Sequence, residues 1–103
     1  MWTKLIATTD IIVGEMVGIS VDKLNLLIVK LDDRFIVYED KCAHLGVPLS
    51  FGTLQKGVIT CCAHHWQYDA RTGKGINPLA TQLRIYPHCI RDNALWADVD
   101  PAQ

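Results

Sequence analysis

Hydrophobic residues in this chain come in short runs of strand length, and polar, turn-forming residues separate the runs. Residues 24–31 and 34–38 are rich in Leu, Ile, Val and aromatic side chains, and only two aspartates lie between them. Two such runs around a two-residue turn predict a β-hairpin. Residues 16–21 have a similar composition and predict a third strand. Because no segment keeps a helical period for more than two turns, the pattern predicts an all-β chain.

A second hairpin is predicted near the C-terminus. Residues 83–90 and 94–99 are apolar runs that flank a polar turn at 91–93. Residues 57–60 predict a further short strand, which leads directly into a cysteine. Together these strands predict a small antiparallel β-barrel or sandwich.

The length of the chain fits one domain. Its 103 residues leave no room for a second domain of ordinary size, so we expect a single domain over residues 1–103. Gly and Pro gather between residues 46 and 87, which predicts loops there. We therefore expect a β base with a loop-rich subdomain at about residues 40–80.

Charge and hydropathy exclude some classes of partner. The formal net charge is −1, and no apolar run approaches the length that a membrane-spanning helix needs. The N-terminus has no charged-then-apolar leader. We therefore expect a cytoplasmic protein that binds neither membranes nor nucleic acids. Residues 41–91, however, hold six basic residues and only one acidic residue, Asp69, which gives +5 and suggests electrostatic steering toward an acidic partner.

Two short boxes combine cysteine with histidine. Residues 42–44 read Cys-Ala-His, and residues 61–65 read Cys-Cys-Ala-His-His, with sixteen residues between His44 and Cys61. Two cysteines and two histidines can hold zinc, and they are also the ligands of a Rieske [2Fe–2S] centre. A zinc finger usually places both cysteines in one box and both histidines in the other. Mixed boxes instead let each loop give one thiolate to one iron and one imidazole to the other.

The register of the second box is ambiguous from its spacing alone. Cys61 with His64 and Cys62 with His65 both satisfy the pattern Cys-x-x-His. The two boxes resemble those of Rieske-type [2Fe–2S] ferredoxins, in which an aromatic residue lies four positions after the second ligand histidine. Tyr68 lies four positions after His64 and three after His65, which favours Cys61 and His64.

The resemblance extends over residues 4–99. Residues 72–78 and 83–87 are similar to the segments that follow the second box in the ferredoxin components of toluene and o-xylene monooxygenase systems. It implies an all-β fold with a cluster-binding subdomain and a covering loop that contains Pro78. It also implies one [2Fe–2S] cluster, whose ligands would be Cys42 and Cys61 on the buried iron and His44 and His64 on the outer iron.

The resemblance implies an electron carrier rather than an enzyme. Such a ferredoxin is a monomer that docks transiently, takes single electrons from a flavin-containing reductase and passes them to a di-iron hydroxylase that oxidises aromatic hydrocarbons. A ferredoxin of a ring-hydroxylating dioxygenase stays open as an alternative. On ligand types alone, a zinc-stabilised interaction module also stays open.

Departures from high-potential Rieske proteins change the expected redox properties. Val47 and Ala63 occupy the positions of the two cysteines that form a disulfide in those proteins, so no such bridge is expected. Trp66 replaces a serine that donates to cluster sulfur, whereas Tyr68 keeps the second hydroxyl donor. Hydrogen bonds to sulfur stabilise the reduced cluster, so we expect a midpoint in the lower half of the Rieske range of about −150 to +300 mV.

Several residues near the boxes have more than one interpretation. Trp66 fits either a docking surface or core packing, and an exposed His65 beside the cluster would tune docking or proton uptake. Cys62 is interpreted as a small buried hydrophobe. Trp2 and Trp96 are expected in the core.

Overall fold

The computed structural model describes residues 1–43, 46–63 and 65–99, and this part of the chain is built almost entirely of β-strands. The elements are β1 (Trp2–Ala7), β2 (Met16–Val21), β3 (Leu24–Lys30), β4 (Phe35–Glu39), the 3₁₀ turn η1 (Leu49–Phe51), β5 (Thr53–Gln55), β6 (Val58–Thr60), β7 (Gln67–Asp69), β8 (Gly75–Asn77), β9 (His88–Arg91) and β10 (Ala94–Asp98).

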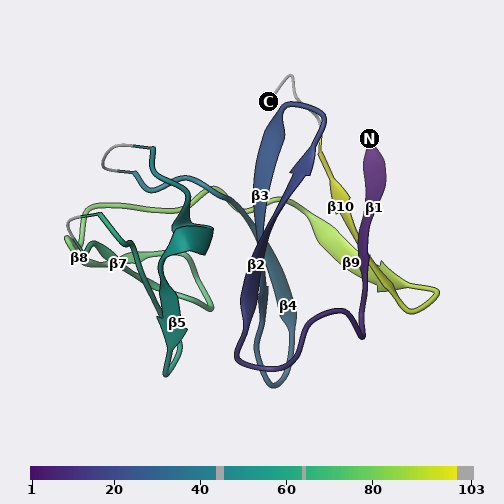
Figure 1. Ribbon diagram of the computed structural model, residues 1–103, viewed down its shortest axis with the longest axis horizontal. Helices are drawn as coiled ribbons and strands as arrows, with labels where there is room; N and C mark the ends of the chain where they lie inside the picture. Colours follow the sequence, from purple (N-terminus) through teal and green to yellow (C-terminus); the bar gives the residue numbers. More distant parts are fainter. Residues whose placement is uncertain (44–45, 64, 100–103) are drawn as a thin grey trace.

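The strands form three antiparallel sheets. Their orders are β1-β10-β9, β2-β3-β4 and β5-β6-β7-β8. Figure 1 shows the β2-β3-β4 sheet in the middle, with the β1-β10-β9 sheet on one side and the β5–β8 segment on the other. The all-β prediction is confirmed.

Strands β3 and β4 of the middle sheet are buried on both faces, because their alternate residues enter two different cores. One core contains Leu27, Val29, Ile36 and Tyr38 together with residues of the 40–80 segment. The other contains Leu26, Ile28, Phe35 and Val37 together with residues of β10. Burial on both faces explains why this hairpin is apolar almost throughout.

Predicted strands over residues 16–21, 24–31, 34–38, 57–60 and 94–99 correspond to β2, β3, β4, β6 and β10. The prediction of one strand over residues 83–90 is wrong, because β9 begins only at His88. The part before it runs beside β4 instead, where Arg84 O accepts from Glu39 N and Tyr86 N donates to Val37 O. Pro87 cannot donate a backbone hydrogen bond, which separates this stretch from β9.

The expectation that Trp2 and Trp96 lie in the core is also wrong. Leu95 and Ala97 point into the core from β10, so the alternation of the strand turns Trp96 outward. Its ring lies 5.0 Å from the Arg91 guanidinium, as measured to the ring centroid. Trp2 is 48% exposed.

The β3–β4 hairpin contacts the turn that follows β7 at two points. At the surface, the Arg71 guanidinium forms ion pairs with Asp32 and Asp33 at 3.1 and 2.8 Å. The hydrogen bond from Arg71 is the main cause that lowers the pKa of Asp33. In the interior, the Tyr38 hydroxyl donates to Ala70 O at 2.6 Å. Because exposed ion pairs stabilise proteins only slightly, the buried Tyr38 bond is the stronger link.

Across the described ranges, the structure has no helix with the length and hydropathy needed to cross a membrane.

Two buried tyrosines allow a matched test of the Tyr38 link. Tyr38→Phe leaves the buried Ala70 carbonyl without its donor, and we expect this to destabilise the protein by about 1–2 kcal/mol. The Tyr86 hydroxyl is buried and has no hydrogen-bond partner among the described residues, so Tyr86→Phe is the control. In anaerobic thermal unfolding followed by circular dichroism, Tyr38→Phe should lower Tm by about 4–8 °C per kcal/mol lost, and Tyr86→Phe should not lower it. Equal Tm values for Tyr38→Phe and the wild type would contradict this account.

Candidate metal centre

Two loops of the 40–80 segment present the cysteines of the two boxes. The first loop leaves β4 and turns back before η1, since Cys42 N donates to Val47 O at 2.8 Å and Gly46 N donates to Cys42 O at 2.9 Å. The second loop joins β6 to β7, and Cys61 N donates to Trp66 O at 2.8 Å. Each loop therefore folds back on its own cysteine.

The two cysteines are buried together. Cys42 is 1% exposed and Cys61 is 0% exposed, and both belong to the core on the β5–β8 side of the middle sheet. Burial raises the pKa of the Cys61 thiol, and a hydrogen bond with Cys42 raises it further. A pair of adjacent buried sulfurs is stable as thiolates only when a cation compensates their charge. This donor set fits one iron of a [2Fe–2S] cluster.

Tyr68 completes the surroundings of the Cys42 sulfur. Its hydroxyl lies 3.5 Å from Cys42 Sγ and accepts a hydrogen bond from Ala43 N at 3.1 Å. Burial, followed by the hydrogen bond with Cys42, raises the pKa of Tyr68 to about 12. The hydroxyl is therefore protonated at neutral pH. Because its oxygen accepts from Ala43, its proton can be donated to a thiolate at Cys42.

The two neighbouring cysteines of the second box lie in different environments. Cys61 is buried, whereas Cys62 is exposed, so the interpretation of Cys62 as a buried hydrophobe is wrong. Cys62 lies in the turn between β6 and β7, where the backbone reverses directly after the buried Cys61 and turns the Cys62 side chain to solvent. His65 is also exposed, and its φ of 56° fits this tight turn. Cys61, which pairs with His64 in the predicted register, is thus the cysteine that accompanies Cys42.

The two candidate histidine ligands, His44 and His64, lie outside the described residues. Within the described ranges, no three His, Cys, Asp or Glu side chains come together in a way that could hold a metal ion. The described part of the centre therefore consists of Cys42, Cys61 and Tyr68. The four-ligand assignment remains a prediction.

The sequence predicts both Trp66 and Pro78 as neighbours of the cluster. Trp66 is half-buried and packs against the core that contains both cysteines, so it has a packing role. Pro78 is half-buried in the turn after β8, and its carbonyl accepts from Thr81 Oγ1 at 3.2 Å. Leu79, which follows it, is 82% exposed. The role of Pro78 in a covering loop remains a prediction.

Sequence reasoning missed two residues that tie the 40–80 segment together. Tyr38 binds the carbonyl of Ala70 from the middle sheet, and Asp40 binds Ser50 across the first loop. No spacing rule connects positions ten or thirty-two residues apart. The available signal was local, because an acidic residue that directly follows a buried strand and precedes Cys42 is expected to need a partner.

Comparisons with known proteins agree with this site. The model of the Rieske [2Fe-2S] domain matches residues 1–87. The chain belongs to the Rieske [2Fe–2S] family. It is 33% identical over 101 residues to the ferredoxin component of the alkene monooxygenase system of Xanthobacter autotrophicus, covering 97% of this chain and 83% of that protein. It is 25% identical over 99 residues to the ferredoxin component of the naphthalene 1,2-dioxygenase system of Pseudomonas putida, covering 95% of each.

A solved structure shares the fold. A chain in a complex of reduced oxygenase and oxidized ferredoxin of carbazole 1,9a-dioxygenase superposes with a TM-score of 0.84 at 26% identity, covering 93% of this chain and 91% of that chain. This Rieske protein therefore carries one [2Fe–2S] cluster and is a ferredoxin, an electron-transfer component rather than an enzyme. As expected from Val47 and Ala63, the described residues, which include all four cysteines, contain no disulfide.

The Tyr68 hydroxyl should raise the reduction potential of this Rieske ferredoxin. Tyr68→Phe removes the donor beside Cys42 Sγ, and we expect the midpoint potential to fall by about 30–60 mV. A shift of about 59 mV corresponds to a tenfold change in the equilibrium constant for one-electron reduction. A spectroelectrochemical titration measures this shift. Tyr38→Phe is the matched control, because its hydroxyl binds a carbonyl, and its midpoint should equal that of the wild type. An unchanged midpoint in Tyr68→Phe would show that the hydroxyl does not act on the cluster.

Proposed function

We propose that this ferredoxin carries single electrons from a flavin-containing reductase to the di-iron hydroxylase of a multicomponent aromatic monooxygenase. The observation that carries the proposal is the burial of Cys42 and Cys61 together in two loops of a Rieske ferredoxin. The similarity to the ferredoxin component of an alkene monooxygenase system supports a monooxygenase partner. The aromatic substrate and the flavin reductase rest on the resemblance to toluene-type systems.

A second candidate is the ferredoxin of a ring-hydroxylating dioxygenase. The relatives from the naphthalene and biphenyl dioxygenase systems favour it, at 25% and 31% identity over nearly the whole chain. The two candidates share the same cluster and the same type of electron transfer. They differ in the oxygenase that accepts the electron.

In the proposed site, Cys42 and Cys61 bind the inner iron and His44 and His64 bind the outer iron. A Rieske cluster supplies a one-electron couple, in which imidazole ligands raise the potential above that of an all-cysteine cluster. The chain contributes the rest. The core excludes water from both cysteine sulfurs, and the Tyr68 hydroxyl donates to one of them.

The charge available for steering is smaller than the sequence count suggests. Arg71 is held in ion pairs with Asp32 and Asp33, and Arg84 and Arg91 stack on Tyr86 and Trp96. Only the ion pairs of Arg71 compensate its charge, because stacking on an aromatic ring leaves a guanidinium charged. Electrostatic steering toward an acidic partner therefore rests on the five other basic residues of the segment, which are Lys41, Lys56, Lys74, Arg84 and Arg91. We propose that docking is transient, that the ferredoxin is a monomer and that it works in the cytoplasm.

Neighbouring residues of the second box give a matched test of the ligand assignment. Cys61→Ser and His64→Ala should each lose the visible absorption and the low-average-g EPR signal of the reduced Rieske cluster, because each removes an iron ligand. Cys62→Ser and His65→Ala are the controls, since both side chains are exposed, and they should keep two irons and two sulfides per chain. Loss of the cluster in Cys62→Ser with retention in Cys61→Ser would overturn the assignment.

Reconstitution distinguishes the candidate partners. The purified ferredoxin is combined with NADH, a flavin-containing reductase and either a di-iron aromatic hydroxylase or a ring-hydroxylating dioxygenase. We expect ferredoxin-dependent formation of a phenol, with one oxygen atom incorporated, in the first mixture only. Formation of a cis-dihydrodiol in the second mixture, with none of the phenol in the first, would favour the dioxygenase candidate instead.

A further inference from the structure

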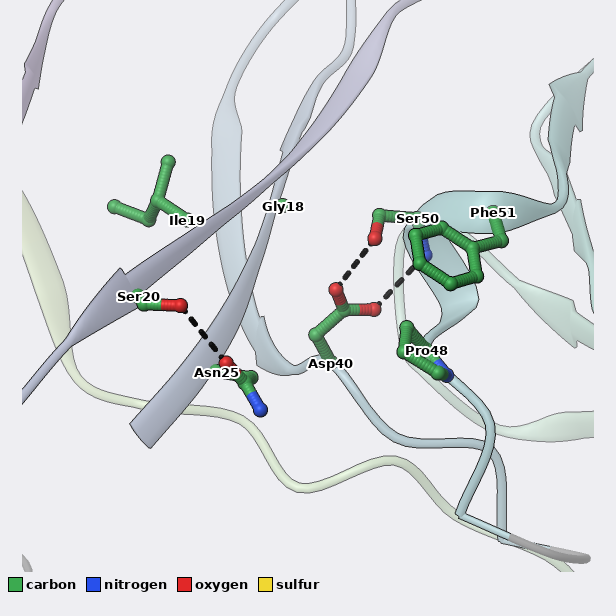
Figure 2. Close-up of a pocket in the computed structure, with 8 residues that line it drawn as sticks. All are labelled: Gly18, Ile19, Ser20, Asn25, Asp40, Pro48, Ser50 and Phe51. Carbon is green, nitrogen blue, oxygen red and sulfur yellow. Dashed lines mark hydrogen bonds between the residues drawn. The ribbon is translucent and has the colours of Figure 1, made fainter. Parts of the chain in front are cut away.

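The two ends of the first ligand loop are joined by one carboxylate. Asp40 Oδ1 accepts from Ser50 N at 2.8 Å, and Asp40 Oδ2 accepts from Ser50 Oγ at 2.6 Å. Figure 2 shows both hydrogen bonds, with the Asp40 side chain directed at Ser50. Asp40 is 6% exposed and is the buried charged residue of the described part of the chain. A buried carboxylate is costly unless such bonds satisfy it, so the Asp40–Ser50 contact is strongly favoured to stay closed.

We call the Asp40–Ser50 contact the clasp, and residues of β2 and β3 in the middle sheet lie against it. Asp40 N donates to Asn25 O at 2.9 Å, which ties the start of the loop to β3. Gly18 of β2 lies directly beneath the contact. A Cβ atom at Gly18 would lie 2.6 Å from Ser50 Oγ and 2.7 Å from Asp40 Oδ2, so only glycine leaves room for the clasp.

The clasp closes the loop that carries Cys42. Between its ends, the loop contains the bonds from Cys42 N to Val47 O and from Gly46 N to Cys42 O. Opening of the Asp40–Ser50 contact would release the end of the loop at η1 while leaving Cys42 tied to Tyr68. The clasp therefore adds to the bonds within the loop and to the burial of Leu49 in holding the end of the loop near Cys42.

We propose that Asp40 and Ser50 are positioning residues, which hold the first ligand loop closed and thereby limit the loss of the cluster. This inference rests on the proposed ligand role of Cys42.

Two substitutions on different elements should open the same clasp. Ser50→Ala removes the hydroxyl donor, and Gly18→Ala pushes on Ser50 and Asp40 from β2. Ser20→Ala is the control, because it removes a similar hydrogen bond, Ser20 Oγ to Asn25 Oδ1 at 2.9 Å, in the same surface hollow of about 240 Å³. The holoprotein is followed in excess iron chelator by loss of visible absorption, and by hydrogen exchange with mass spectrometry.

We expect Ser50→Ala and Gly18→Ala to lose the cluster about tenfold faster than the wild type, the size of effect that one hydrogen bond to a charged group supports. Exchange in residues 41–50 should rise by a similar factor, whereas exchange in β3 should stay at the wild-type rate. Ser20→Ala should match the wild type in both measurements. If Gly18→Ala does not take up a cluster, Ser50→Ala decides, because it adds no atoms.

Wild-type rates of cluster loss in Ser50→Ala would overturn the inference. So would an equal rise of exchange in β3, because the clasp would then contribute only to global stability. Failure of the ligand assignment has a different signature, since Cys42→Ser would then keep its cluster while Ser50→Ala still exchanged faster in residues 41–50.

Discussion

Cys42 and Cys61 lie side by side in a core that shields both sulfurs from water, and the arrangement of the chain follows from this contact. Burial raises the pKa of the Cys61 thiol, so the charged form is costly unless a cation accompanies it. Iron supplies that charge in a Rieske protein. The same burial that disfavours two thiolates without a cation thus favours a bound cluster, and metal binding contributes to folding.

Strand β4 connects the Cys42–Cys61 contact to the rest of the molecule. Tyr38, near its end, binds the turn after β7, and Asp40, directly after it, binds the end of the first ligand loop. Tyr68 then links the second loop to the first through Cys42 and Ala43. Because β4 is buried on both faces, the ligand loops are attached to the most enclosed part of the fold. A rigid attachment suits a carrier, since little reorganisation then accompanies each electron.

Structural features that depend on the local pattern of residue types could be predicted from the sequence. The β3–β4 hairpin was predictable because two long β-branched runs surround Asp32 and Asp33. The resemblance, through Tyr68, favoured Cys61, which is the cysteine buried with Cys42, and its ligand role stays a prediction. Strands β5, β7 and β8 have three residues each, too few for a period of two to be visible, and they lack the run of three β-branched residues that marks the equally short β6. The Asp40–Ser50 and Tyr38–Ala70 bonds join distant positions, so only the folded chain reveals them. The exposure of Cys62 depends on a backbone turn that its residue type does not encode.

Two cysteines and two histidines are proposed to hold one [2Fe–2S] cluster in this chain. Hyperfine spectroscopy of the reduced protein labelled with ¹⁵N-histidine tests this ligand set, because nitrogen bound to iron couples strongly to the unpaired electron. We expect two strongly coupled histidine nitrogens per cluster. A reduced cluster with one such nitrogen, or with none, would rule out the proposed ligand set.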